Sequence, residues 1–246
     1  MRLAFAFALA VFAVSAVTLA LACTGPGTRD APGAPPTAST TPPADATAGH
    51  AVRYLALGDS FTIGTGSGPT SALPARLSER WRRAGCTVEL ENVAVNGYTT
   101  DDLIDEELPA IARFKPTFVT VAVGANDIVR GRTEAAYRAN VKRIFAAVVA
   151  GAGTARIVAL PQPDWSKSPA ASGFGTPEAI ATSIKTFNAA LAAEAQAARV
   201  TFIDLYPLME RQADQKMLAS DGLHPSAGAH DAWADALAAA LPAPCP

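Results

Sequence analysis

The sequence predicts an α/β fold in three layers, α/β/α, with a five-stranded parallel sheet between two layers of helices. Short apolar runs alternate with longer stretches of helical patterning, which is the order expected of βαβ units. The run at residues 117–123 is apolar almost throughout, as is typical of a parallel strand buried on both faces. Polar motifs stand at the ends of several runs, where open parallel sheets bind their ligands.

The expected elements follow one another from residue 52 to residue 241. The first strand, 52–57, runs straight into a turn and precedes a helix at 72–85. The second strand, 88–95, precedes a helix at 100–114. The remaining elements, in chain order, are strand 117–123, helix 134–150, strand 155–160, helix 177–198, strand 200–205 and helix 227–241.

Local signals define several of these boundaries. Thr100 is expected to cap the second helix, and Asp101 and Asp102 stabilise its first turn because they complement the helix dipole. Pro116 separates this helix from the third strand. Gly151 is expected to end the third helix.

Composition and charge limit the functions that the chain can have. It has 246 residues, half of them hydrophobic, and a formal net charge of −2. Residues 51–246 are enough for one domain with a sizeable core. The near-neutral balance gives no electrostatic footprint for nucleic acid, and the basic stretch 80–83 fits a surface helix. Nucleic acid is therefore not expected as a partner.

Residues 1–23 have the pattern of an export signal. Arg2 supplies a positive charge, a long apolar run follows, and small residues precede Cys23. Residues 20–22 fit ordinary signal cleavage, whereas 19–23 resemble a bacterial lipoprotein box. A third interpretation is an uncleaved membrane helix, because the run approaches the length of a span. All three place the domain outside the cytoplasm; we expect a bacterial membrane lipoprotein with its lipid on Cys23, or else a secreted or periplasmic protein.

The next segment, 24–50, is expected to be a disordered linker. It is rich in proline, alanine and threonine and has almost no large apolar residue, so it cannot bury enough surface to fold. Its prolines favour extended polyproline conformations, which would make it a semi-rigid spacer between a lipid anchor and the domain. A plain disordered tail is the alternative. Membrane contact is expected only through the N-terminal anchor.

The three cysteines divide into one candidate anchor and one candidate pair. If Cys23 carries a lipid, Cys86 and Cys245 remain as an even pair in an oxidising compartment. Cys86 opens the second strand, and Cys245 lies just beyond the last helix. In a doubly wound sheet, a helix that starts at the face with the polar motifs ends at the opposite face, where the second strand begins. We therefore predict a Cys86–Cys245 disulfide, with two free thiols as the alternative.

Four polar motifs are expected to converge on one edge of the sheet. They follow the first, second, third and fifth strands, and parallel strands place their carboxyl ends at the same edge. The motifs are Gly58-Asp59-Ser60, Asn96-Gly97, Gly124-Ala125-Asn126-Asp127 and Asp221-Gly222-Leu223-His224. A serine at such a turn can be a nucleophile, and a carboxylate three residues before a histidine can reach its imidazole ring. The sequence thus predicts one candidate site.

These motifs resemble, in order and in rough spacing, the four sequence blocks of the GDSL or SGNH hydrolase family. The matching residues are Gly58-Asp59-Ser60, Asn92 with Gly97, Gly124-x-Asn126-Asp127 and Asp221-x-x-His224-Pro225. A lone Gly-Asp-Ser is a weak signal, whereas four blocks in order at predicted strand ends are strong evidence. The resemblance covers residues 52–241 and implies a flavodoxin-like hydrolase that acts on esters.

The resemblance also implies a role for each matching residue. Ser60 would be the nucleophile, His224 its base, and Asp221 the group that orients the base. The backbone N–H groups of Ser60 and Gly97 and the side-chain amide of Asn126 would donate to the oxyanion. The chemistry of the residue types agrees, because an amide can donate a hydrogen bond at neutral pH and an ionised carboxylate cannot.

Each of these residues also has a purely structural interpretation. Ser60 can be a turn serine or an N-cap, and Gly97 can simply permit a left-handed turn. Asn126 can cap the following segment, and His224 can stand at a helix start with Pro225 in its first position. We favour the catalytic interpretation because four such coincidences at strand ends are improbable.

The irregular stretch 161–176 follows the fourth strand and should hang over the site. A loop of this length is usually functional or disordered. Trp165 and Phe174 within it are expected to wall the acyl or alcohol pocket, although Trp165 could instead pack against the sheet edge. Asp59 and Asp127 are interpreted as supports of loop geometry.

No metal or organic cofactor is implied. His50 lies in the linker and His230 on the closing helix, and neither has a partner at metal-ligand spacing. The glycine-rich stretch 64–68 lacks the Lys-Ser/Thr of a phosphate loop and is expected to be a flexible active-site loop. The Gly-x-Ser-x-Gly elbow of the other large hydrolase class is absent.

The sequence therefore predicts a serine-dependent carboxylic ester hydrolase that forms an acyl-enzyme. We expect it to act on short-chain, acetyl-type esters of small molecules, glycans or lipids, and to be a monomer. One alternative is a lysophospholipase or thioesterase that acts on longer acyl chains. The other is a tethered, non-catalytic surface-binding protein; intact Ser60, Gly97, Asn126 and His224 argue against it.

Overall fold

A computed structural model describes residues 51–245 of the chain, which all belong to one compact unit, Asp45–Pro246. The expected export signal, the lipid site at Cys23 and the linker 24–50 lie outside the described residues. None of the helices in the described range combines the length and the apolar character that a membrane span requires.

The sheet has five parallel strands in the order β2-β1-β3-β4-β5. This order is that of flavodoxin-like folds. The chain adds β2 on one side of β1 and the later strands on the other side, so the topological switch point lies between β1 and β3. The predicted fold class is therefore confirmed. The strands are β1 (Val52–Gly58), β2 (Val88–Asn92), β3 (Phe118–Ala122), β4 (Arg156–Ala159) and β5 (Thr201–Phe202).

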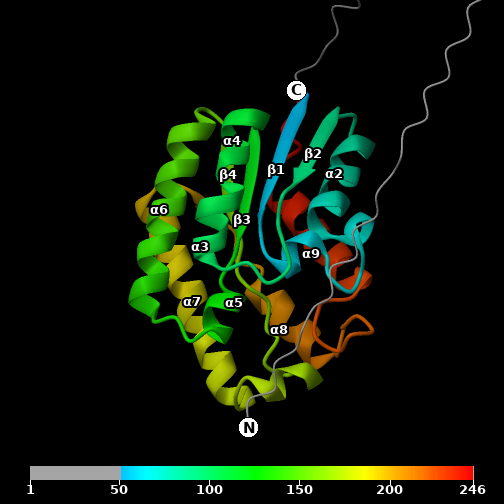
Figure 1. Cartoon of the computed structure of the whole chain (residues 1–246). Helices are drawn as coiled ribbons and strands as arrows, with labels where there is room; N and C mark the ends of the chain where they lie inside the picture. Colours follow the sequence, from blue (N-terminus) through cyan, green and yellow to red (C-terminus); the bar gives the residue numbers. More distant parts are fainter. Residues whose placement is uncertain (1–50, 246) are drawn as a thin grey trace, which may run out of the picture. The chain divides into compact units, whose positions relative to one another are not determined.

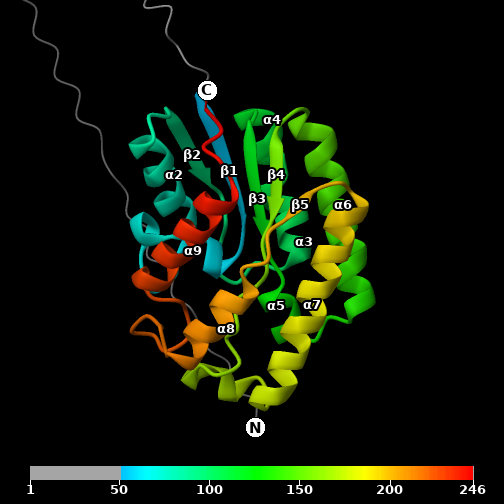
Figure 2. The ribbon, with the colours of Figure 1, turned by 180° about the vertical axis from the view of Figure 1, so that it is seen from behind.

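Helices cover both faces of the sheet (Figures 1 and 2). One face carries α3 (Thr100–Asp102), α4 (Pro109–Phe114), α6 (Glu134–Ala152) and α7 (Pro177–Ala197). The other carries α2 (Leu73–Arg83), α8 (Tyr206–Asp214) and α9 (Ala227–Ala240). Short helical turns fill the loops, namely α1 (Ser60–Ile63), η1 (Pro69–Ser71), α5 (Ala125–Val129) and η3 (Pro169–Gly173).

The side chains of β1 divide the core into two apolar clusters. Leu55 and Leu57 point to the face covered by α6 and α7, while Tyr54 and Ala56 point to the face covered by α2 and α9. This alternation is the ordinary two-residue period of a strand. All four side chains are fully buried, so β1 is packed tightly on both faces and holds the turn that follows it in a fixed place.

The expected helix 100–114 is divided into three parts. A single π-helical turn, η2 (Leu103–Glu107), separates α3 from α4, and the Leu108 N–H bonds to the Leu103 carbonyl oxygen. Thr99 rather than Thr100 caps the first part, because Thr99 and Asp102 form a reciprocal capping box. Thr100 is instead buried and bonds to Asp127 below the site.

Other boundaries differ by a few residues from the expected ones. Helix α6 continues past Gly151 to Ala152, and Gly153 follows it with a positive φ of 60°. Strands β2 to β5 are shorter than expected, most of all β2 and β5, which each pair with only one neighbour at the margin of the sheet. The nine-residue helix α8 was not predicted; it lies between β5 and the Asp221 motif.

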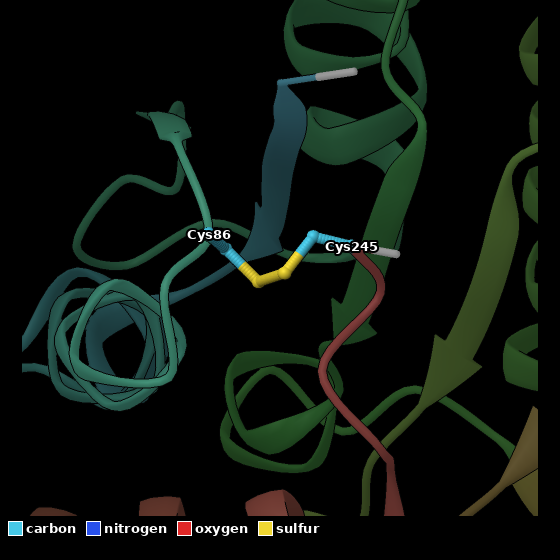
Figure 3. The surroundings of a disulfide bond; sticks show 2 residues. All are labelled: Cys86 and Cys245. Atoms are coloured by element: carbon cyan, nitrogen blue, oxygen red, sulfur yellow. A yellow bond between two sulfur atoms is a disulfide. The ribbon is translucent and has the colours of Figure 1, made fainter. Parts of the chain in front are cut away.

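A disulfide joins Cys86 to Cys245, whose Cα atoms are 5.5 Å apart (Figure 3). Cys86 lies between α2 and β2, and Cys245 follows α9. Both residues contact the apolar cluster beneath α2 and α9. The bond ties the end of the chain to the edge of the sheet where the strands begin, opposite the polar motifs.

We expect loss of this disulfide to lower the free energy of unfolding by about 2–5 kcal/mol. The reason is that the bond closes a loop between residues 159 apart in sequence, which restricts the unfolded chain. Urea unfolding of the Cys86→Ser/Cys245→Ser double variant measures the loss, and a reductant should change the wild-type protein but not the double variant. Equal midpoints for the two proteins without reductant would contradict the expectation.

Candidate active site

Ser60 stands at the first position of α1, two residues after the end of β1. Asp59 caps this short helix, and its carboxylate accepts a hydrogen bond of 3.1 Å from the Phe61 N–H. The helix ends at Gly64, whose φ is 84° and whose N–H bonds to the Ser60 carbonyl oxygen. Strand, cap and one helical turn therefore fix the backbone on both sides of Ser60.

Only glycine fits at position 58, where β1 ends. A Cβ there would lie 2.3 Å from Thr62 Oγ1 and 2.4 Å from the Ala122 carbonyl oxygen. The turn thus packs directly against α1 on one side and β3 on the other. A turn with so little free space cannot shift without disturbing its neighbours.

The loop after β2 brings Gly97 to the same edge. Asn92 anchors this loop, because its amide donates to the Thr62 carbonyl oxygen at 2.9 Å and accepts from the Ala94 N–H at 3.2 Å. Gly97 has a φ of 87°, a conformation that L-residues with side chains rarely adopt, and open space lies where a Cβ would stand. A ligand can therefore approach its backbone closely.

The loop after β3 places Asn126 near the start of α5. Its side-chain Nδ2 donates to the Tyr98 carbonyl oxygen at 3.0 Å, which fixes the orientation of the amide. An amide nitrogen carries two hydrogens, so one remains for a ligand. Arg130, which directly follows α5, donates to the Gly97 carbonyl oxygen at 2.9 Å and links the two loops.

His224 and Asp221 form a hydrogen-bonded pair in the loop before α9. His224 Nδ1 lies 2.7 Å from Asp221 Oδ2, while Asp221 Oδ1 accepts from the N–H groups of Leu223 and His224 at 2.9 and 3.0 Å. Because a carboxylate only accepts, Nδ1 carries the hydrogen, and Nε2 is the nitrogen left to act as a base. The imidazole ring packs against the Phe61 ring, with centroids 5.4 Å apart.

The loop that carries this pair is closed like a hairpin. Leu218 and Pro225 form an isolated antiparallel bridge, and the Ala219 N–H bonds to the His224 carbonyl oxygen at 2.7 Å. Pro225 is therefore part of this bridge, and Ser226 rather than His224 caps α9.

The glycine-rich stretch 64–68 packs against the histidine–aspartate loop. A Cβ at Gly66 would lie 2.6 Å from Asp221 Oδ2, the oxygen that contacts the imidazole. Backbone hydrogen bonds from Thr65 to Ser60 and from Gly68 to Gly64 hold the stretch as a compact turn. It therefore lies beside the site, as expected of an active-site loop, while its flexibility stays a prediction.

Burial and hydrogen bonding shift the pKa of two acids near Ser60 in opposite directions. Burial alone would raise the pKa of Asp221, but the hydrogen bonds from Leu223 and His224 outweigh it, so its pKa is lowered and the group is ionised. Asp59 is fully buried, and that burial raises its pKa to about 7. The two acids therefore differ: Asp221 carries a full charge next to the imidazole, and Asp59 does not carry one at mildly acid pH.

Asp127 is buried behind the site and links the loop after β3 to α3. Its carboxylate accepts from the Thr100 hydroxyl at 2.6 Å and from the Thr100 N–H at 2.9 Å, and it pairs with Arg132 at 2.5 Å. It is fully buried and does not line the cavity described next. Asp127 thus connects α5 to α3 and lies in the supporting position expected of it.

A cavity of about 230 Å³ joins these loops. Four of the five residues predicted to act on the substrate line it, namely Ser60, Gly97, Asn126 and His224, and the fifth, Asp221, is bonded to His224. Trp165 and Phe174 line it as well, with ring centroids 6.1 Å apart. Trp165 is buried with Phe61 and Ala125 rather than at the sheet edge, and Phe174 is 51% exposed.

The cavity has five further lining residues. Asn96, Ala125 and Leu223 lie within the four polar motifs, and Phe61 and Val129 lie outside them. Phe61 directly follows Ser60, a position that could have marked it, whereas Val129 follows no motif directly. Among residues 51–245, no cluster of three or more His, Cys, Asp or Glu side chains is arranged to hold a metal ion.

Comparison with known families decides which group of proteins this arrangement belongs to. The sequence model of the GDSL-like lipase/acylhydrolase family matches residues 56–232. The chain belongs to this family. It is accordingly a carboxylic ester hydrolase. A search of curated proteins gave no match.

Solved structures of GDSL-type enzymes have the same fold as this GDSL hydrolase. TesA is 23% identical, with a TM-score of 0.64 over 77% of this chain and 97% of TesA. Axe2, an acetylxylan esterase from Geobacillus stearothermophilus, is 18% identical, with a TM-score of 0.61 over 76% and 92%. The psychrotrophic esterase EstA from Pseudoalteromonas sp., solved inhibited by monoethylphosphonate, is 17% identical, with a TM-score of 0.60 over 75% and 93%.

Proposed function

We propose that this GDSL hydrolase cleaves short-chain, acetyl-type esters through an acyl-enzyme on Ser60. The observation that carries the proposal is the 2.7 Å contact between Asp221 and His224 Nδ1 beside a cavity lined by Ser60, Gly97, Asn126 and His224. Nucleophile, oriented base and oxyanion donors are the three parts that acyl transfer needs.

The proposed reaction has two symmetrical halves. Ser60 Oγ attacks the ester carbonyl carbon while His224 Nε2 takes the hydroxyl proton, and the protonated imidazole then gives this proton to the leaving alcohol. Water next attacks the acyl-enzyme, His224 again takes a proton, and Ser60 Oγ leaves with it to release the acid. The ionised Asp221 stabilises the imidazolium that forms in each half.

Three donors are available for the oxyanion of the tetrahedral intermediate. They are the N–H groups of Ser60 and Gly97 and the second Nδ2 hydrogen of Asn126. Arg130 and Tyr98 support this part of the cavity, because Arg130 fixes the Gly97 carbonyl and the Tyr98 carbonyl fixes the Asn126 amide. The donors are thus held before the substrate arrives.

We expect the Asn126→Ala variant to lose about 10²- to 10³-fold in kcat, the usual effect of removing one oxyanion donor. Asn126→Asp should lose at least as much, because a carboxylate of the same shape accepts instead of donating and repels the oxyanion. Steady-state kinetics on a short ester measure both. A kcat within a few-fold of wild type in Asn126→Asp would show that this amide does not contact the oxyanion.

The size of the cavity supports a small acyl group. At about 230 Å³ it lies below the roughly 300–1,000 Å³ of sites that enclose drug-sized ligands. Phe174, Trp165 and Val129 give it apolar walls that suit a short alkyl group. Axe2 is an acetylxylan esterase by its description, so the same fold accommodates an acetyl ester in that protein.

One observation favours the second candidate, a hydrolase of longer acyl chains. Val95, Val129 and Phe174 are the exposed large apolar residues at or next to the cavity, with exposed fractions of 39%, 41% and 51%. A longer chain could leave the cavity and lie across these side chains, because exposed apolar surface in a cluster commonly marks a binding site.

Hydrolysis of p-nitrophenyl esters from acetyl to palmitoyl tests the proposal. We expect kcat/KM to be highest for acetyl or butyryl and to fall for longer chains, with no enzymatic turnover in the Ser60→Ala variant. A maximum at decanoyl or longer would favour the lysophospholipase or thioesterase alternative. Absence of Ser60-dependent turnover on every ester would favour the tethered binding protein.

We further propose that the protein is exported and lipid-anchored at Cys23. The Cys86–Cys245 disulfide supports export, because disulfides persist mainly in oxidising compartments. A Cys23→Ser variant should then appear outside the membrane fraction when the natural host produces it. Unchanged membrane association of that variant would contradict lipidation.

A further inference from the structure

Glu107 is a buried acid beneath the nucleophile turn, and the proposed mechanism does not use it. Its side chain is 1% exposed, and Oε2 accepts a hydrogen bond of 2.8 Å from the Gly58 N–H. Gly58 ends β1 and stands two residues before Ser60. A single side chain from η2 thus contacts the backbone that leads into the nucleophile.

The Gly58 N–H needs this partner because β2 ends before it reaches the level of Gly58 in the sheet. The last register pair between the two strands joins Ala56 to Asn92, and the Ala56 carbonyl accepts from the Val93 N–H at 3.1 Å. Gly58 lies two residues further on, so its N–H points to the same side, beyond the paired part of β2. Without Glu107 this buried N–H would have no hydrogen-bond partner, at a cost in free energy.

Tight packing couples the position of Gly58 to that of Ser60. On its other side Gly58 still pairs with Ala122 of β3, and the clash of a Cβ with Thr62 shows that the turn fills its space. The next residue is Asp59, the N-cap of α1. A shift of the Gly58 peptide would therefore move the N-cap and with it the Ser60 hydroxyl and N–H.

The place of Glu107 in its helix is unusual for an acid. Its neighbour Glu106 is exposed, as is Asp105, whereas Glu107 points inward. The π-helical turn that presents it is a local widening of the kind often found at functional sites.

We propose that Glu107 is a positioning residue: its carboxyl group replaces the missing β2 carbonyl, fixes the Gly58 peptide and so places Ser60 for attack. The inference rests on the proposed serine mechanism and adds a residue that acts through the backbone of the nucleophile turn.

The charge state of Glu107 fits this role. Burial raises its pKa to about 9 against the lowering effect of the Gly58 hydrogen bond, and the carboxylates of Asp59 and Asp102 raise it further. Glu107 is therefore protonated at neutral pH, accepts from Gly58 as a neutral group, and adds no negative charge beneath the oxyanion. A neutral acceptor of the same shape should replace it.

The test compares Glu107→Gln with Glu107→Met, and uses Glu106→Met as the matched control on the same helical turn. Glutamine keeps the acceptor and methionine keeps only the length. We expect kcat in Glu107→Gln and Glu106→Met to stay within about twofold of wild type, and kcat in Glu107→Met to fall about tenfold or more with KM nearly unchanged. In ¹⁵N–¹H spectra the Gly58 and Ser60 amide signals should shift in Glu107→Met only.

Three results would overturn the proposal. The first is a tenfold loss in a folded Glu107→Gln, since that would make the charge rather than the acceptor essential, and it applies even if Glu107→Met fails to fold. The second is an unshifted Gly58 amide in Glu107→Met. The third is a loss that appears in KM alone. Failure of the serine mechanism would give a different result from all three. The Ser60→Ala variant would then turn over ester at the wild-type rate, while the Gly58 amide signal would still shift in Glu107→Met.

Discussion

The Ser60→Ala variant should hydrolyse esters about 10⁴- to 10⁶-fold more slowly than the wild-type protein. The expected loss is large because, among residues 51–245, Ser60 has the one hydroxyl group that lines the cavity beside His224, and the cap at Asp59 fixes its place. Any residual rate would come from the oxyanion donors acting on bound substrate and water. Steady-state kinetics on p-nitrophenyl acetate measure the loss.

Ser183→Ala is the matched control for this change. Ser183 lies on α7, where its hydroxyl bonds to the Ala179 carbonyl oxygen, and it does not line the cavity. Its kcat and KM should equal those of the wild-type protein. A Ser60→Ala variant that keeps a tenth or more of the wild-type kcat would exclude Ser60 as the nucleophile.

The second large effect is expected for Asp221→Asn, with a loss of about 10³- to 10⁴-fold in kcat. Asparagine can keep the oxygen that accepts from the Leu223 and His224 N–H groups, and its NH₂ group then faces His224 Nδ1. A donor at that place holds the imidazole in the tautomer with its hydrogen on Nε2, which cannot take the Ser60 proton. The loop should keep its shape while the base is lost.

The control for the aspartate is Asp235→Asn. Asp235 is an exposed carboxylate on α9 that pairs with Arg80, far along the helix from the loop that carries Asp221. It should retain wild-type kinetics. If Asp221→Asn kept more than a tenth of the wild-type kcat with an unchanged melting temperature, Asp221 would not be orienting the base.

The strands and the convergence of the motifs could be predicted because burial and backbone geometry impose them locally. A parallel strand buried on both faces must be apolar along its length, so 117–123 was recognisable as β3. Parallel strands also place their carboxyl ends at one edge, so the sequence alone predicts that Ser60, Gly97, Asn126 and His224 lie close together, and all four line one cavity.

The details that sequence reasoning missed depend on contacts between distant residues. Thr100 has the side chain of a good N-cap, but its hydroxyl bonds to Asp127, and Thr99 forms the capping box instead. In the sequence, Glu107 looks like one more acid in a helix. It can accept from the Gly58 N–H only because β2 ends before it could pair with Gly58. No local pattern contains that information.

The sequence of α8 does carry a helix signal. Pro207 stands in its first turn, where proline is favoured, and Leu208, Met209 and Gln212 have helical spacing. The buried Met209 and Gln212 face the core side of α8. The helix extends the chain between β5 and the Asp221 loop.

Reaction with a fluorophosphonate tests the central claim most directly. Such a reagent forms a stable bond to an activated serine oxygen with loss of fluoride, and EstA, of the same fold, was solved inhibited by a phosphonate. We predict one adduct per molecule by intact mass spectrometry, located on Ser60 by peptide mapping and absent in Ser60→Ala and strongly slowed in His224→Ala. An unmodified wild-type protein, or an adduct on another residue, would contradict the serine mechanism.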